Sequence, residues 1–314
     1  MMGAGYNIGA MKVMIPEAFI RTIEGGWGQA GRDWLERLPG LVELCAQRWS
    51  LSVEGTFAEL SYNYVLRVRR ADGSRAVLKL GVPEVELSSE MAALQFYAGR
   101  GCACLYESNA ELGALLIERL EPGEMLASLE DDDRATLIAA GVMERLWRPA
   151  TADWQGSLSV AGWARGLQRL RDQFGGGSGP LPEALVGRAE GLFGELLASA
   201  GEPYLLHGDL HHFNILRAQR EAWLAIDPKG VLGEPAYELG AFLYNPQPDF
   251  PWRSDLGKVL ARRVALLCER LGLDRQRVLG YGVAQAVLSA CWDIEGNVPR
   301  WEGMIRVAEE LANL

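Results

Sequence analysis

The sequence predicts an α+β fold of two lobes, a small strand-rich lobe over residues 1–120 and a larger helical lobe over residues 121–314. Short apolar runs bounded by turn residues dominate the first part, as is typical of strands. Apolar residues spaced three and four apart, as on one face of a helix, dominate the second part. At 314 residues the chain is long for one ordinary domain and short for three, which also favours two lobes with a cleft between them.

The first lobe should contain a sheet and one framed helix. The elements expected in it are a helix over residues 34–49, strands over residues 51–57, 64–70 and 75–80, a helix over residues 86–98 and a short buried strand over residues 115–117. The second and third strands form a hairpin, because Asp72-Gly73 tolerates the positive φ angles that a tight turn needs. Gly99 is expected to end the helix over residues 86–98, because glycine adopts the left-handed C-cap conformation at little cost.

The second lobe should be mostly helical. Its clearest amphipathic patterns predict helices over residues 163–174, 185–196 and 256–271. The glycine-rich stretch over residues 175–180 is interpreted as a flexible connector between the first two of these helices. A non-helical island over residues 204–233 interrupts the pattern, and residues 223–226 within it predict a short apolar strand.

The charge balance limits the partners. The chain has 31 basic and 41 acidic residues, a net charge of −10, which argues against nucleic acid because neutralising phosphates needs a basic surface. It argues weakly against an anionic membrane surface and permits a cationic small molecule. The five cysteines, odd in number and without zinc-finger spacing, suit a reducing compartment. Because neither a signal peptide nor a membrane-spanning run is present, a cytoplasmic protein is expected.

The histidines of the chain gather in one segment. His207, His211 and His212 are the only three, and they lie within one hexapeptide. A metal site is one interpretation, but the adjacent His211 and His212 would point to opposite sides of an extended chain. The segment fits the catalytic loop of kinases better, because His207-x-Asp209 is followed by four residues and then Asn214.

The residue types in this segment match the needs of phosphoryl transfer. A carboxylate must lie near the attacking hydroxyl, and we assign this catalytic role to Asp209. The phosphates need a cation, and hard oxygen ligands for Mg²⁺ are available from Asn214 and Asp227. Asp227 ends the predicted strand over residues 223–226, so a short hairpin would return it beside Asn214.

A phosphate-binding lysine is then expected in the first lobe. Lys79 lies in the predicted strand over residues 75–80, and Glu90 follows eleven residues later in the framed helix. We expect Glu90 to pair with Lys79 and to orient it toward the ATP phosphates. The alternatives are a solvated surface role for Lys79 and pairing with Glu86, which lies on the same helix.

Several segments together resemble one family of enzymes, the aminoglycoside/hydroxyurea antibiotic resistance kinases, and within it the streptomycin 6-phosphotransferases. The resemblance covers roughly residues 25 to 312. The segments that carry it are Trp27-Gly28-x-Ala30-Gly31-Arg32, Val77-Leu78-Lys79 with Glu90, Leu116-Ile117-Glu118-Arg119-Leu120, the loop from His207 to Asn214, Ile226-Asp227-Pro228-Lys229-Gly230, Gly233-Glu234-Pro235-Ala236-Tyr237-Glu238 and Cys291-Trp292.

The resemblance implies a protein-kinase-like fold and MgATP as the phosphoryl donor. It also implies that the segment from Glu118 to Leu120 is a hinge whose backbone binds adenine. The sequence departs from the kinase pattern in one respect, since it has no Gly-x-Gly-x-x-Gly loop. Gly55 stands alone near the loop expected over the phosphates, with Thr56, Ser61 and Asn63 nearby, so side-chain hydroxyls or amides are expected to replace the backbone contacts.

The acceptor is the open question. The resemblance implies an aminoglycoside, and the guanidinium groups of streptomycin pair well with carboxylates. Candidate acceptor-binding carboxylates are Glu238, Asp293 and Glu295, although Glu238 is also placed to brace the catalytic loop and the other two are as consistent with a solvated surface. Two alternatives remain: phosphorylation of hydroxyurea or another small metabolite, and nucleotide binding without turnover. The intact set of Lys79, Asp209, Asn214 and Asp227 argues against the second alternative.

Overall fold

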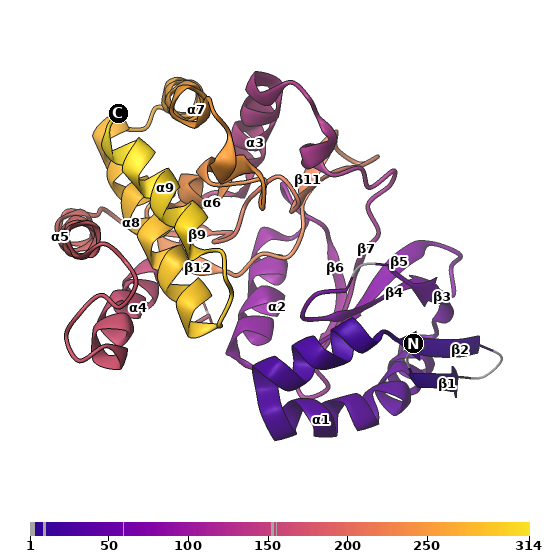
Figure 1. Cartoon of the computed structure of the whole chain (residues 1–314). Coiled ribbons are helices and arrows are strands. Elements are labelled where there is room, and N and C mark those ends of the chain that lie inside the picture. Colours follow the sequence, from indigo (N-terminus) through magenta and orange to yellow (C-terminus); the bar gives the residue numbers. More distant parts are fainter. Residues whose placement is uncertain (1–3, 9–10, 59, 152–153, 155) are drawn as a thin grey trace. The chain divides into compact units, whose positions relative to one another are not determined.

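The computed structural model describes residues 4–8, 11–58, 60–151, 154 and 156–314 (Figure 1). The chain divides into two compact units, the first formed by Met1–Gly99 and Ala103–Leu120, the second by Arg100–Cys102 and Glu121–Leu314. The short segment of residues 100–102 joins the second unit because the Ala225 N–H donates to the Gly101 carbonyl at 2.8 Å. Nothing in the sequence pattern indicates that these three residues belong to the second unit.

The first unit is built on an antiparallel sheet of strand order β3-β4-β5-β7-β6, and β1 and β2 form a separate hairpin (Figure 1). Its described elements are β1 (Ala4–Ile8), β2 (Met11–Ile15), α1 (Glu17–Arg48), β3 (Ser52–Thr56), β4 (Tyr64–Arg69), β5 (Arg75–Leu80), α2 (Val85–Tyr97), β6 (Leu105–Asn109) and β7 (Ala114–Glu118). The predicted hairpin between β4 and β5 is confirmed: Gly73 has a φ of 83°, and the Asp72 carboxylate accepts the Ser74 N–H at 2.9 Å.

Helix α1 differs from its prediction. It begins well before residue 34, and Gly28, with φ 55° and ψ −125°, interrupts it. Pro39 lies inside the helix, so the helix lacks the hydrogen bond that a backbone N–H would donate at that position. The helix is held by packing instead, because Phe19, Trp34 and Leu38 are buried in the same apolar core as strands β4, β5 and β7.

The second unit is mainly helical, with short antiparallel pairs of strands. Its described elements are a 3-10 turn at Leu126–Ser128, α3 (Asp132–Leu146), β8 (Arg148–Pro149), α4 (Val160–Gln173), α5 (Glu183–Ala198), β9 (Tyr204–Leu206), β10 (Ile215–Arg217), β11 (Trp223–Ala225), β12 (Val231–Gly233), α6 (Pro235–Leu243), a 3-10 turn at Phe250–Trp252, α7 (Leu256–Leu271), α8 (Arg275–Glu295) and α9 (Trp301–Ala312). Strand β9 lies between β12 and β8, and β10 pairs with β11. None of the helices in the described part of the chain is long and apolar enough to cross a bilayer.

The expected flexible connector between α4 and α5 is a packed turn. Ser178 is buried and its hydroxyl donates to the Leu181 carbonyl at 2.6 Å. The Phe174 ring lies so close to Gly179 that a Cβ there would come within 2.5 Å of it. The glycines at this turn therefore serve close packing and positive φ angles rather than flexibility.

Candidate active site

In the first unit, Lys79 and Glu90 form a buried ion pair. Lys79 lies in β5, and its Nζ is 2.7 Å from Oε1 and 2.8 Å from Oε2 of Glu90 in α2. The two side chains are only 4% and 8% exposed. Glu86 lies exposed in the first turn of the same helix, so the pairing with Glu90 is the one that the structure has. A buried ion pair of this kind fixes the orientation of the lysine side chain.

The segment expected to be the hinge follows β7. The Glu118 N–H donates to the Cys104 carbonyl at 2.8 Å, and the Cys104 N–H donates to the Glu118 carboxylate at 3.0 Å. Leu120 is buried. The Glu118 side chain thus holds its own segment against the chain before β6, while adenine binding by the backbone stays a prediction.

In the second unit, the predicted hairpin between Asn214 and Asp227 is present. Strands β10 and β11 pair with Ile215 opposite Ala225, and the Ile226 N–H donates to the Asn214 carbonyl at 2.9 Å. Asn214 and Asp227 therefore flank the open end of one hairpin. Asp227 has a φ of 59°, a left-handed conformation that aspartate tolerates better than most residues.

Asn214 also contacts the proposed catalytic residue. Its Nδ2 donates to the Asp209 carbonyl at 2.9 Å and lies 3.5 Å from Asp209 Oδ2. Because the amide nitrogen is used in this way, the amide oxygen is the atom of Asn214 that suits a cation.

His207 ties the Asp209 backbone to the strand that precedes Asp227. Its Nδ1 accepts the Asp209 N–H at 3.3 Å, and its Nε2 donates to the Ile226 carbonyl at 2.8 Å. Burial lowers the pKa of His207 to about 3. A neutral imidazole has one donor and one acceptor nitrogen, which is what these two bonds require.

Glu238, in α6, lies under the catalytic loop. Its carboxylate accepts the His207 N–H at 2.6 Å and the Gly208 N–H at 2.8 Å, and the residue is 1% exposed. Burial raises the pKa of Glu238 to about 7, against the lowering effect of the two backbone hydrogen bonds. Of the two roles left open for Glu238, the structure favours bracing of the loop over binding of an acceptor.

The three histidines point in different directions. His211 Nε2 is 3.5 Å from Asp209 Oδ1, whereas His212 is buried and stacked on Phe242 with ring centroids 4.1 Å apart. Across the part of the chain that the structure describes, no three His, Cys, Asp or Glu side chains are arranged to hold a metal ion.

Arg263 is a buried residue that is not among those predicted from the sequence. It lies in α7, is 1% exposed, and donates to the carbonyls of Phe242 and Asn245 at 3.1 and 2.6 Å. Its Nη2 is 3.3 Å from His212 Nε2. Its position on the apolar face of the helix, between Leu260 and Leu267, is a signal that could have revealed it.

The other two candidate carboxylates differ in their surroundings. Glu295 forms a two-bond pair with Arg169, at 2.8 and 3.1 Å. Asp293 has a weaker contact, 3.9 Å from Arg300, and burial raises the pKa of its carboxyl. Burial and then the charges of Asp209 and Asp293 raise the pKa of Tyr244. Glu295 thus pairs closely with an arginine, whereas the contact of Asp293 with Arg300 is longer.

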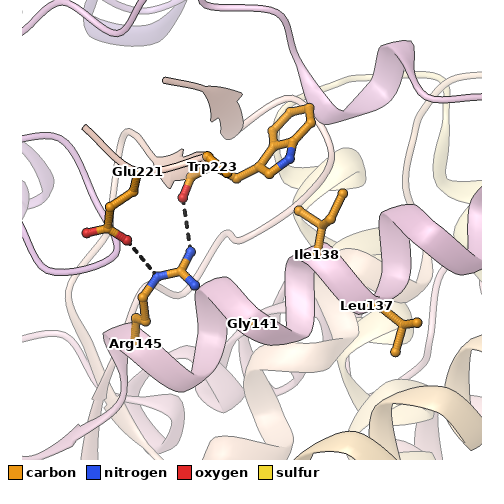
Figure 2. Close-up of a pocket in the computed structure, with 7 residues that line it drawn as sticks. Leu137, Ile138, Gly141, Arg145, Glu221 and Trp223 are labelled. Carbon is orange, nitrogen blue, oxygen red and sulfur yellow. Dashed lines mark hydrogen bonds and ion pairs between the residues drawn. The ribbon is translucent and has the colours of Figure 1, made fainter. Parts of the chain in front are cut away.

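A pocket of about 190 Å³ lies elsewhere in the second unit, between α3 and the turn that leads into β11 (Figure 2). Arg145 forms an ion pair with Glu221 at 2.9 Å and donates to the Trp223 carbonyl at 3.0 Å. The lining contains none of the predicted site residues, and its polar groups bond to each other. The residues that line it are Leu137, Ile138, Gly141, Arg145, Glu221, Ala222 and Trp223.

The fold is that of small-molecule kinases. A solved structure of a thermostable mutant of aminoglycoside phosphotransferase APH(4)-Ia, in a ternary complex with ADP and hygromycin B, matches with a TM-score of 0.60 at 13% sequence identity. The match covers 86% of this chain and 97% of that chain. The protein-kinase-like fold implied by the sequence resemblance is therefore confirmed.

Sequence similarity places the chain more narrowly. The profile of the aminoglycoside/hydroxyurea antibiotic resistance kinases matches residues 48–296. A streptomycin 6-kinase of Streptomyces glaucescens is 38% identical, over 90% of this chain and 92% of that protein. A hydroxyurea phosphotransferase of Kitasatospora aureofaciens is 36% identical, over 97% of this chain and 87% of that protein. The chain belongs to the aminoglycoside/hydroxyurea antibiotic resistance kinase family and is an ATP-dependent phosphotransferase, as the sequence predicts.

Proposed function

We propose that this enzyme transfers the γ-phosphate of ATP to a hydroxyl of an aminoglycoside, with streptomycin as the substrate. The observation that carries the proposal is the contact of Asn214 with Asp209 at one end of the β10–β11 hairpin, with Asp227 at the same end. The similarity to a streptomycin 6-kinase supports the choice of acceptor.

Asp209 is the proposed catalytic base. It accepts the proton of the acceptor hydroxyl while the hydroxyl oxygen attacks the γ-phosphorus and ADP departs. His207 holds the Asp209 backbone through its Nδ1, and Glu238 holds the turn through two backbone N–H groups. The carboxylate is therefore oriented before the acceptor arrives, which lowers the entropic cost of reaching the transition state.

The remaining residues of the proposal act on the nucleotide. In the first unit, Lys79 binds the phosphates and Glu90 orients it, while the backbone from Glu118 to Leu120 binds adenine. In the second unit, the Asn214 amide oxygen and the Asp227 carboxylate form a hard donor set that suits Mg²⁺. When bound there, Mg²⁺ would neutralise charge on the phosphate oxygens.

Among the three candidate carboxylates, we propose Asp293 for recognition of a guanidinium group. Glu238 is buried with both oxygens bonded, and Glu295 already pairs with Arg169. Asp293 is partly buried, and its contact with Arg300 is long, at 3.9 Å. A charge-assisted hydrogen bond to an arginine-like group is directional and suits this partly buried carboxylate.

A second candidate function is phosphorylation of hydroxyurea, which the 36% identity to a hydroxyurea phosphotransferase favours. The test is to incubate the purified enzyme with MgATP and, separately, streptomycin, hydroxyurea and a neutral sugar, and to follow product mass and ADP release. A streptomycin product one phosphoryl group heavier, absent with Asp209→Asn, supports the first proposal. If only hydroxyurea gives a product, hydroxyurea replaces streptomycin as the proposed acceptor. If none of the three compounds gives an ATP-dependent product, nucleotide binding without turnover is the function that remains.

A further inference from the structure

The loop between β3 and β4 is held by side chains rather than shaped by glycine. Residues 57–63 contain no glycine. The Phe57 N–H donates to the Val65 carbonyl at 3.1 Å, and the Arg67 guanidinium lies 5.0 Å from the centre of the Phe57 ring. Leu60 packs against the apolar core of the first unit. Phe57 and Leu60 are therefore held by contacts within the protein before a ligand binds.

Trp27 connects this loop to a second element. It precedes Gly28, where α1 is interrupted, and its ring meets the ring of Tyr62 edge to face, with centroids 6.1 Å apart at 73°. Its Nε1 donates to the Glu84 carboxylate at 3.0 Å. Glu84 is the N-cap residue of α2, so one side chain contacts both the loop and the start of that helix.

The other end of this chain of contacts is the phosphate-binding pair. Helix α2 carries Glu90, which binds Lys79 at 2.7 Å. We infer that Trp27 and Tyr62 are positioning residues, which hold residues 60–63 of the loop between β3 and β4 in the shape that binds the ATP phosphates and couple these residues to α2. The inference rests on the proposed function, because it takes Lys79 as the phosphate-binding residue.

The expected effect follows from the population of the ordered loop. A ligand that binds only one loop conformation loses affinity in proportion to the fraction of molecules that adopt it. Loss of an edge-to-face aromatic pair should therefore weaken phosphate binding by about 2- to 10-fold. Adenosine lacks phosphates, so its affinity should not change.

The experiment measures inhibition constants of ADP and adenosine against ATP for wild type and variants. Tyr62→Ala removes one ring from an exposed position, and Tyr62→Phe restores the ring without the hydroxyl. Leu44→Ala is the matched control, because Leu44 is an exposed apolar residue on α1 outside the cluster. Lys79→Ala tests the nucleotide site itself.

Tyr62→Ala should raise the ADP constant about 2- to 10-fold and leave the adenosine constant unchanged, while Tyr62→Phe and Leu44→Ala match the wild type. Trp27→Leu should add less to Tyr62→Ala than it does to the wild type, since the ring pair is already lost and the hydrogen bond to Glu84 is the contact that remains to be removed. If Lys79→Ala weakens ADP but Tyr62→Ala does not, or if Tyr62→Ala weakens both ligands equally, the positioning role is overturned. If Lys79→Ala leaves ADP binding unchanged, the proposed nucleotide site fails instead.

Discussion

The Asn214 Nδ2 donates to the Asp209 carbonyl at 2.9 Å, so a proposed metal ligand and the proposed base are joined by a direct hydrogen bond. Asp227 follows β11, the other strand of the same hairpin, and its carboxylate is the group proposed to bind the cation. The two ligands should therefore respond differently to substitution, because one also supports Asp209 and the other offers a cation a full charge.

Asp227→Ala should raise the Mg²⁺ concentration needed for half-maximal activity more than Asn214→Ala does. Asn214→Ala should also lower kcat at saturating Mg²⁺, because Asp209 loses a hydrogen bond. Mg²⁺ titrations of steady-state rates measure both effects. Titration curves that coincide with the wild type for both variants would remove these residues from the metal site.

Asp209→Ala should lower kcat by about 10²- to 10⁴-fold, the range for loss of general-base help. ADP should still bind with wild-type affinity, because the role proposed for Asp209 is to accept the proton of the acceptor hydroxyl. Single-turnover assays and calorimetry measure the two quantities, and Asp249→Ala is a matched control at an exposed aspartate. A variant rate within about threefold of wild type would remove Asp209 from catalysis.

Lys79→Ala should raise KM for ATP and lower kcat, and Glu90→Ala should do the same more weakly. The reason is that Lys79 is the proposed phosphate ligand, whereas Glu90 would act on the phosphates only through Lys79, which lies 2.7 Å from it. Glu86→Ala serves as the control, since Glu86 lies exposed on the same helix. A larger effect at Glu86 than at Glu90 would contradict the assigned pair.

Glu238 should make stability depend on pH in a defined direction. Its pKa is about 7 in the folded protein against an ordinary value of 4.5, so the folded state binds the extra proton between these values. The contribution of the protonated Glu238 carboxyl to the stability of the folded state is present in full below pH 4.5 and is lost as pH rises through 7. This loss amounts to roughly 3 kcal/mol of unfolding free energy.

Urea denaturation of wild type and Glu238→Gln at pH 5 and pH 8 measures this dependence. The stability of the wild type relative to Glu238→Gln should fall at the higher pH, because glutamine does not titrate. Glu302→Gln, at an exposed position of α9, should show no such change. A stability difference that stays constant with pH would mean that Glu238 is ionised throughout.

Asp293→Asn should raise KM for streptomycin by about tenfold or more, the scale of a charged hydrogen bond. Glu295→Gln should change it little, because Glu295 pairs with Arg169. The Asp293 effect should shrink as salt rises, since the Debye length falls to about 10 Å at 0.1 M. If both variants match the wild type in KM, the acceptor lies elsewhere and the kinase assignment is unaffected.

Local patterns allowed much of the fold to be predicted. The Asp72-Gly73 turn, the strand that ends near Lys79 and the helix of Glu90 are visible because turn and helix preferences act between near neighbours. The catalytic loop is equally local, since Asp209 and Asn214 are five residues apart. Strand β6 was not predicted, because its residues are largely half-buried or exposed and show no apolar run.

The sequence by itself determined the class of enzyme and the residues proposed for its chemistry, because these lie in short segments with recognisable spacing. Only the tertiary structure decided what surrounds them. Glu238 reaches His207 across 31 residues, and Arg169 pairs with Glu295 across 126 residues. Such contacts depend on how distant helices pack, so no local preference records them. That is why three similar carboxylates in the sequence have three different surroundings: Glu238 accepts two backbone N–H groups of the catalytic loop, Glu295 pairs closely with Arg169, and Asp293 has a long contact with Arg300.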